Sequence, residues 1–231
     1  MTRRQQGRAE QRGRILESAR TLFGTRSFDD VTMAEIAERA GVARATVFNH
    51  FPSKRSLVEA ITHEVLAYWA SMLEHALADE SSPTPALVRA LFAQMGEGIA
   101  HYHGFYRGVF REIARLRLGL EEGSQAARTS ATAFERLCRL LARGQARGEL
   151  RADVDVAELA SGFDSLANGT INQWLFGDHS GSLAERMARM AEIYLGSVAV
   201  SGADAGAAAV LKLPAVPRAP ARRMRAPRRT R

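Results

Sequence analysis

Apolar side chains recur at the period of an α-helix along most of this chain, and no stretch alternates between apolar and polar residues for long enough to predict a sheet. Glycines, prolines and capping pairs divide the pattern into separate segments. The predicted helices cover residues 10–24, 33–40, 43–49, 53–79, 85–100, 105–118, 125–147, 155–176 and 182–200. We therefore expect an all-α fold.

The net charge of +7 is distributed unevenly along the 231 residues. Residues 1–60 carry a net charge of +4, residues 212–231 carry +8, and the segment between them carries −5. Basic ends around an acidic middle are typical of a protein that meets an anionic partner, and nucleic acid is the first candidate. Solvated basic tails are the alternative interpretation.

The cysteine count and the N-terminus indicate the compartment. A single cysteine, Cys138, excludes an internal disulfide framework and a zinc site built from several thiolates. The first fourteen residues hold five arginines but lack the apolar run of a secretory signal, and no segment has the length and hydropathy of a membrane span. We expect a cytoplasmic protein without membrane contact.

Residues 32–51 have the length and order of a helix-turn-helix unit. Thr32 and Glu35 form a capping pair that opens a short helix, and Gly41 ends it. The segment Ala43–His50 then predicts a second helix with small residues on its outer face and an arginine and an asparagine that can donate hydrogen bonds. Such a helix is thin enough to enter the major groove of DNA.

The run TMAEIAERAGVARATVFNHFPSKRSLVEA, residues 32–60, resembles the N-terminal signature of TetR-family transcriptional regulators of the TetR/AcrR type, as does the upstream run ILESARTLFGTRSF, residues 15–28. The resemblance implies an N-terminal three-helix helix-turn-helix domain joined by a long helix to a helical ligand-binding and dimerisation domain. The division expected is a basic arm over 1–8, a DNA-binding domain over 9–69 with its motif at 32–51, a second domain over 70–201, and a disordered Ala/Pro/Arg tail over 202–231.

The resemblance also implies a set of DNA contacts. Thr32, His50 and Lys54 match positions that bind phosphate in the family, Arg44 and Ala45 match positions that face bases, and Thr46 matches one that contacts backbone or base. Phe48 stands where the family usually has tyrosine, so the contact of a hydroxyl to phosphate is absent. Asn49 is a candidate for reading adenine.

The second domain is expected to enclose a small-molecule pocket and to form a homodimer. The candidate pocket residues are Phe92, Met95, Tyr102, Phe110, Phe163 and Trp174. The candidate dimer residues, on a helix pair that could form a four-helix bundle with its copy, are Leu159, Phe163, Leu166, Met187, Met190 and Tyr194. Packing within one subunit is the alternative for both sets.

No catalytic constellation is legible in the sequence, so we predict a protein that is not an enzyme and needs no cofactor. His101 and His103 are two residues apart, a spacing that puts them on different sides of a helix, so no metal site is expected. The predicted function is a ligand-responsive repressor that binds a pseudo-palindromic double-stranded operator as a dimer. The rival is a sequence-tolerant DNA binder that uses its two basic ends.

Overall fold

The computed structural model describes residues 2–26, 28–101, 106–111, 114, 123–177 and 181–200, and within these ranges the chain is helical with no named strand. The elements are α1 Arg3–Thr25, α2 Met33–Ala40, α3 Arg44–His50, α4 Lys54–Ala78, α5 Thr84–His101, α7 Gln125–Ala146, α8 Val156–Phe176 and α9 Leu183–Val198. The all-α prediction is confirmed.

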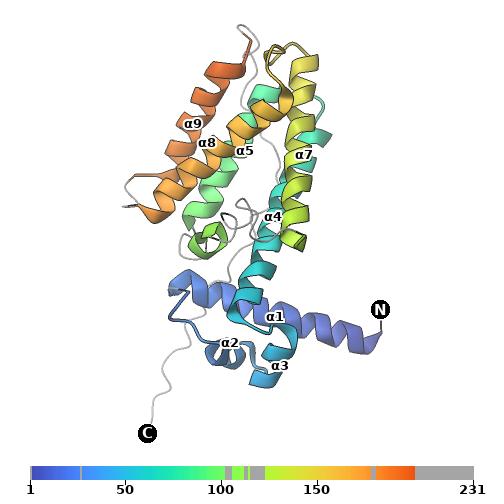
Figure 1. Ribbon diagram of the computed structural model, residues 1–231, viewed down its shortest axis with the longest axis vertical. Coiled ribbons are helices and arrows are strands. Elements are labelled where there is room, and N and C mark those ends of the chain that lie inside the picture. The colour runs from blue at the N-terminus through green and yellow to red at the C-terminus, as the bar shows by residue number, and fades with distance from the viewer. Residues whose placement is uncertain are drawn as a thin grey trace.

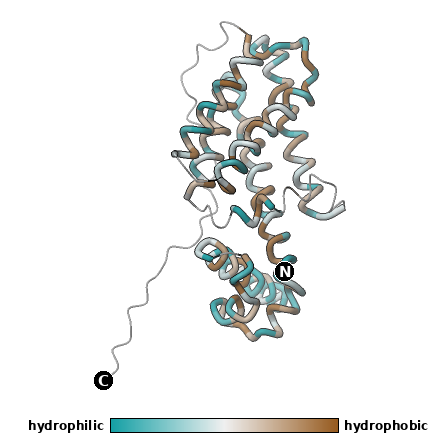
Figure 2. Tube along the Cα trace, turned by 60° about the vertical axis from the view of Figure 1, so that its left-hand side comes forward, coloured by the Kyte–Doolittle hydropathy of each residue, from teal (hydrophilic) through white to brown (hydrophobic). Residues whose placement is uncertain are grey.

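The chain forms a small N-terminal unit of α1–α3 and a larger bundle of α5–α9, and α4 runs from one into the other (Figures 1 and 2). In the small unit, Ile15, Ile36 and Val47 are fully buried against the start of α4. In the bundle, α4 packs along α7, and α5 packs along α9. One helix therefore belongs to both cores.

Side-chain caps explain why most helices begin where the sequence indicates. Thr32 and Ser53 accept hydrogen bonds from the backbone N–H three residues later, and Asp155 and Ser182 cap α8 and α9. Each cap satisfies one of the backbone donors that a helix start leaves without an intrahelical partner. The sequence-based bounds of these helices are correct to within about two residues.

Helix α1 begins at Arg3, seven residues before the predicted start, so it includes residues 3–8 of the segment expected as a basic arm. Thr2 and Gln5 form a complete capping box that starts the helix early. Residues 3–6 are exposed and have no core to face, which is why apolar periodicity could not reveal this part of the helix. Figure 1 shows this end of α1 projecting beyond α3.

Two predicted segments lie wholly or partly outside the described residues. Of the helix predicted over 105–118, residues 106–111 are described and are helical, with Tyr106 and Phe110 buried. The tail over 202–231 lies outside the described residues.

Gly96 lets α5 and α9 approach closely. A Cβ atom at this position would lie 2.9 Å from the Cα of Ala184 on the first turn of α9. Side chains at this point would separate the two helices, because backbone atoms cannot move aside as a flexible side chain can.

Candidate DNA-binding surface and effector pocket

Helix α2 and helix α3 meet at a turn that only a few residue types adopt easily. Gly41 has a φ of 64° in the left-handed region, and its N–H bonds back to the carbonyl of Glu38. Helix α3 starts three residues later and is anchored by Val47, which is fully buried, and by Phe51, which is 3% exposed at its C-terminal end. These two anchors fix which face of α3 points outward.

The outward face of α3 carries most of the residues predicted to contact DNA. Arg44, Ala45, Phe48 and Asn49 are exposed, and Thr46 is half-buried. The Arg44 guanidinium lies over the Phe48 ring, 5.7 Å from its centroid, and Phe48 is 40% exposed. The Phe48 ring offers an apolar contact, and the Arg44 guanidinium stacked on it offers hydrogen-bond donors. Both groups lie on the same surface of α3.

His50 lies at the junction between α3 and the basic helix α1. Partial burial lowers the pKa of His50, and the positive charges of Arg8 and Arg12 lower it further. Arg12 also stacks over Phe51, 5.1 Å from the ring centroid. Arg4, Arg8 and Arg12 are exposed and follow one another at four-residue spacing, so they share one face of α1. The basic surface around α3 therefore continues along α1.

Lys54 is half-buried and makes its contacts within the protein in this structure, and the phosphate contact expected for it stays a prediction. Its Nζ donates to the carbonyls of Phe28 at 2.6 Å, Val31 at 3.0 Å and Asp29 at 3.3 Å, and it lies 4.4 Å from the centroid of the Phe28 ring. Three carbonyls use the three donors of an ammonium group. Lys54 in the free protein therefore holds the loop between α1 and α2 against the start of α4.

We expect Lys54→Met to lower the free energy of unfolding by about 1–3 kcal/mol, because it leaves partly buried carbonyls without a donor. Chemical denaturation followed by circular dichroism measures the change. Arg55→Met is the matched control, since Arg55 is exposed and pairs with Glu59 on the same helix. A Lys54→Met protein that is as stable as the wild type but unable to bind DNA would assign Lys54 to phosphate contact instead of support of the loop.

Thr32, the predicted phosphate-binding cap, is exposed and sits in a charged network. Its Oγ1 lies 2.9 Å from Glu35 Oε2, and Glu35 Oε1 accepts from Arg26 at 2.5 Å. The hydrogen bond from Arg26 and those from the backbone and side chain of Thr32 lower the pKa of Glu35 to about 2. The network fixes the first turn of α2 beside the loop that Lys54 holds.

The Glu35 network makes the stability of this unit depend on acid. A carboxyl group whose pKa is lower in the folded state than its ordinary 4.5 stabilises the fold above that value, and this contribution disappears as the pH falls toward 2. We expect Glu35→Gln to be less stable than the wild type at pH 7 and equally stable near pH 2. Urea denaturation of both proteins at several pH values between 7 and 2 tests this expectation. Glu38→Gln is the control, because Glu38 is exposed. A wild-type advantage that persists at pH 2 would contradict the account.

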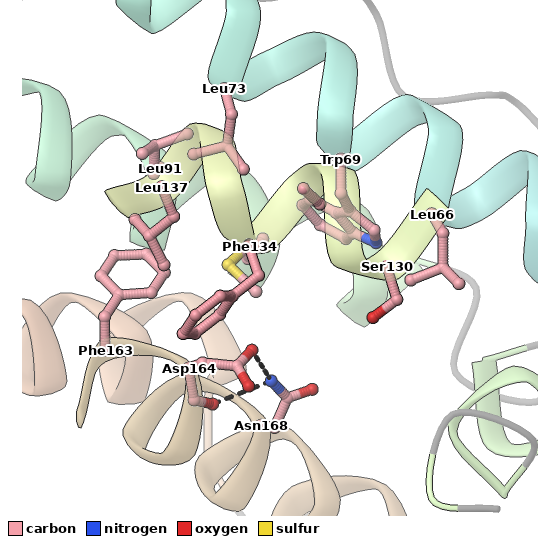
Figure 3. A pocket seen from close by; sticks show the side chains of 12 residues that line it. Leu66, Trp69, Leu73, Leu91, Ser130, Phe134, Leu137, Phe163, Asp164 and Asn168 are labelled. Atoms are coloured by element: carbon pink, nitrogen blue, oxygen red, sulfur yellow. Dashed lines mark hydrogen bonds between the residues drawn. The ribbon is translucent and has the colours of Figure 1, made fainter. Parts of the chain in front are cut away.

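A cavity of about 120 Å³ opens between α4, α5, α7 and α8 (Figure 3). Most of its wall is apolar, and three aromatic rings face it. It is lined by Leu66, Trp69, Leu73, Leu91, Met95, Ser130, Ala133, Phe134, Leu137, Phe163, Asp164 and Asn168. A mainly apolar pocket with a few polar groups is typical of small-molecule binding sites.

The predicted pocket residues divide between this cavity and the core. Met95 and Phe163 line the cavity, whereas Phe92, Phe110 and Trp174 are buried and do not belong to its lining. Phe92 packs edge-on against Phe163 at 4.6 Å between centroids, and Trp174 donates its indole N–H to the carbonyl of Gly181. A ligand contact of these three residues stays a prediction. Tyr102 lies outside the described residues.

Trp69 and Phe134, the aromatic residues that α4 and α7 contribute to the cavity, were not among the predicted pocket residues. Both are half-buried and share the apolar faces of their helices with ordinary core residues. Periodicity shows that a side chain points inward, but it cannot show whether the neighbouring helix leaves a gap there. The polar pair Asp164 and Asn168, four residues apart on an otherwise apolar helix, was a usable signal.

The predicted dimer residues mostly serve the protomer's own core. Leu159, Phe163, Met187 and Tyr194 are buried within one chain, which favours the alternative of packing within one subunit. Tyr194 donates its hydroxyl hydrogen to the carbonyl of Leu159, and burial raises the pKa of its phenol. The outer faces of α8 and α9 instead present half-buried Leu166 and Met190 and the exposed Ile193. Helix α9 packs against both α5 and α8. Its most regular apolar face is therefore buried within the subunit.

Comparisons with known proteins agree with this two-part architecture. Residues 15–61 match the model for bacterial regulatory proteins of the tetR family, and residues 85–196 match the model for the C-terminal domain of SbtR-like transcriptional regulators. Together the matched ranges cover more than half of the chain. The chain belongs to the TetR family. This is a family of transcriptional regulators, in agreement with the sequence-based prediction that the protein is not an enzyme.

The relatives come from several bacteria. The transcriptional repressor KstR2 of Mycolicibacterium smegmatis is 30% identical over 95 residues, which cover 41% of this chain and 46% of KstR2. The regulator TtgR of Pseudomonas putida is 39% identical over 74 residues, 29% of this chain and 35% of TtgR. The chain thus aligns with less than half the length of these curated relatives, and the alignment alone does not carry their ligands over to it.

Solved structures resemble the chain over nearly its whole described length. The repressor FadR of Thermus thermophilus, solved with lauroyl-CoA, has a TM-score of 0.61 and 25% identity and covers 85% of this chain and 99% of FadR. KstR2 of Mycobacterium tuberculosis has a TM-score of 0.61 and 21% identity, covering 82% and 95% of the two chains. Within the described part of this chain, no helix is long and apolar enough to cross a membrane.

Proposed function

We propose that this protein is a cytoplasmic, ligand-responsive transcriptional repressor that binds a pseudo-palindromic operator as a homodimer. The observation that carries the proposal is the position of α4. Its N-terminus is packed into the helix-turn-helix unit, and its middle contributes Leu66, Trp69 and Leu73 to the pocket wall. A ligand in the pocket therefore touches the helix that aims the DNA-binding unit.

Arginine side chains attach α4 firmly to α7. Arg136 donates to the carbonyl of Ala70 at 2.8 Å and pairs with Glu74 at 2.7 Å. Arg143 donates to the carbonyls of Leu77 at 2.8 Å and Ala76 at 3.1 Å, groups of the last helical turn that lack intrahelical partners. A ligand that widens the space between this helix pair and α8 would therefore tilt α4 and α7 together.

Such a tilt changes the distance between the two recognition helices of a dimer, which must match half-sites about one helical turn of DNA apart, roughly 34–36 Å, or a multiple of it. Ligand and operator then bind antagonistically, and linkage requires each to weaken the other by the same factor. Repression needs only occupancy of the promoter, which is why we propose a repressor and not an activator.

We propose that the dimer forms through the outer faces of α8 and α9, which lie side by side on one flank of the bundle (Figure 1). Exposed small residues, including Ser161, Ser165 and Gly169, allow a second helix to approach closely, and Ile193 is 57% exposed. Half-buried Leu166 and Met190 would complete the apolar contact. The proposed dimer surface therefore uses the outward-facing residues of α8 and α9 and not the inward-facing residues that periodicity favoured.

For the DNA surface we propose Arg44, Ala45 and Asn49 as base-facing residues, with Phe48 making an apolar contact. Thr32, Thr46 and His50 are proposed to contact the DNA backbone. Arg4, Arg8 and Arg12 extend the basic surface along α1 and supply phosphate contacts beside it. Lys54 supports this surface from behind.

The test is a titration of the purified full chain against its own upstream promoter DNA and a scrambled DNA of equal length, at two salt concentrations. We expect discrimination of about a thousandfold or more. Equal and strongly salt-dependent binding to both DNAs, and to neighbouring promoters, would favour the sequence-tolerant rival. Repeating the titration without residues 202–231 measures what the basic tail adds to the salt dependence.

A further inference from the structure

A second cavity, of about 290 Å³, lies at the junction where α4 passes from the DNA-binding unit into the bundle (Figure 1). Its walls come from α1, the end of α3, the first turns of α4 and the start of α7. It is lined by Arg12, His50, Phe51, Ser56, Glu59, Ala60, His63, Ser124, Gln125 and Ala126. Most of these residues are polar, and none of them lines the apolar pocket. This junction cleft therefore suits a different class of ligand.

The junction cleft holds donors that the rest of the protein does not use. Arg12 is exposed and stacks on the Phe51 ring, 5.1 Å from its centroid, and it makes no ion pair with the described residues. The half-buried rings of His50 and His63 make no hydrogen bond within the described part of the chain. A histidine ring has at least one N–H to donate in either protonation state. Three side chains from three helices thus offer N–H groups to one space.

The charge of the junction cleft favours an anion. Glu59 is the one acidic residue among the described lining, and its carboxylate already lies 3.1 Å from Arg55 Nε on the same helix. Arg12 has no such partner. Burial lowers the pKa of His50, and the positive charges of Arg8 and Arg12 lower it further, so positive potential extends into the cleft. An anion would relieve this repulsion and accept charge-assisted hydrogen bonds.

We propose that the junction cleft binds a compact phosphate group, as inorganic phosphate or a small phosphate monoester, held by Arg12, His50 and His63. This second ligand site goes beyond the proposed function, which places the effector in the apolar pocket. An anion bound here contacts the DNA-binding unit through α1 and α3 and the start of the bundle through α4. It would therefore join the two units across their junction.

The volume admits more than a bare ion. A cavity of about 290 Å³ lies close to the lower end of the range of roughly 300–1,000 Å³ that is usual for small-molecule sites. Phe51, Ala60 and Ala126 supply a small apolar wall beside the polar groups. A phosphate monoester with an organic part of a few atoms fits this combination.

A phosphate of the DNA backbone has the same chemistry as a free phosphate, so the test has one arm for each source. In the first arm the full-length protein, without DNA, is titrated with inorganic phosphate at pH 7 and at an ionic strength held constant with sodium chloride. Proton NMR follows the histidine rings, assigned with His→Gln variants. We expect the His50 and His63 signals to shift along one saturation curve with a dissociation constant of about 1–10 mM, as for a ligand of so few atoms. His75 is the internal control, because it is exposed on α4 outside the cleft lining.

Two variants test the named contacts. Arg12→Gln should weaken phosphate binding at least fivefold, because it removes the charged donor of the site. Arg14→Gln is the matched control, since it removes an exposed arginine of α1 that does not line the cleft. His63→Gln should weaken binding at least twofold, read from the His50 signal. Circular dichroism verifies that each variant is folded.

The inference is wrong if the His50 and His63 signals stay in place up to about 100 mM phosphate, tenfold above the weakest affinity expected. It is also wrong if His75 shifts equally, or if folded Arg12→Gln binds phosphate as the wild type does. The second arm adds operator DNA in place of phosphate. Shifts of both signals with DNA but not with free phosphate would assign the cleft to the DNA backbone and overturn the proposal. The first arm contains no DNA, so its failure is separate from failure of the operator titration.

Discussion

Replacing Arg44 with alanine is expected to reduce operator affinity by about 30-fold to 20,000-fold. A side chain that reads a base by two hydrogen bonds contributes about 1–3 kcal/mol of discrimination, and a homodimer loses two such contacts at once. Arg44 is exposed at the first turn of α3 and stacks on Phe48 without supporting the core. The loss should therefore fall on recognition and leave the fold intact.

The measurement is a DNA titration at fixed salt with operator and scrambled DNA, accompanied by thermal unfolding. Arg139→Ala is the matched control, since it removes the same charge from an exposed position on α7 in the other unit. A drop of equal size on both DNAs would identify Arg44 as a phosphate contact. Unchanged operator affinity in a folded Arg44→Ala protein would remove Arg44 from the DNA surface.

Replacing Phe163 with alanine should have the largest effect on stability, a loss of about 3–5 kcal/mol in the free energy of unfolding. Phe163 is 6% exposed, and its ring packs 4.6 Å from Phe92 and 5.7 Å from Tyr194, centroid to centroid. Truncation removes this packing and joins a new void to the existing pocket. The surrounding helices cannot collapse fully around the void, because Gly96 already brings α5 and α9 into backbone contact.

Denaturant unfolding followed by circular dichroism measures this loss. Phe48→Ala removes the same atoms at a position that is 40% exposed, and we expect it to cost less than about 1 kcal/mol. Comparable losses for both variants would mean that Phe163 is not a central core residue.

Local chemistry explains why much of the fold could be predicted. Capping by Thr32, Ser53 and Ser182 acts within a few residues, so the starts of α2, α4 and α9 can be seen in the sequence. The left-handed turn at Gly41 is equally local. The start of α1 was missed although its cap at Thr2 is of the same kind, because no apolar stripe follows it to mark the helix.

The roles of inward-facing residues depend on partners that are distant in sequence. Tyr194 and Leu159 are 35 residues apart and are joined by a buried hydrogen bond, and Lys54 reaches carbonyls more than twenty residues upstream. Periodicity assigned Tyr194 and Leu159 to an intersubunit surface, and resemblance assigned Lys54 to phosphate. In this structure the side chains of Tyr194 and Lys54 make their hydrogen bonds inside the protomer.

The sequence by itself therefore determined the helices, their order and the recognition unit, since periodicity, caps and turn residues act over a few positions and the motif is contiguous. Only the tertiary structure decided which apolar faces are buried within the subunit and where the helices leave a cavity. It also placed Asp164 and Asn168 at the edge of that cavity. A void and its lining arise from the packing of four helices brought together from distant parts of the chain, and no local pattern encodes the space left between them.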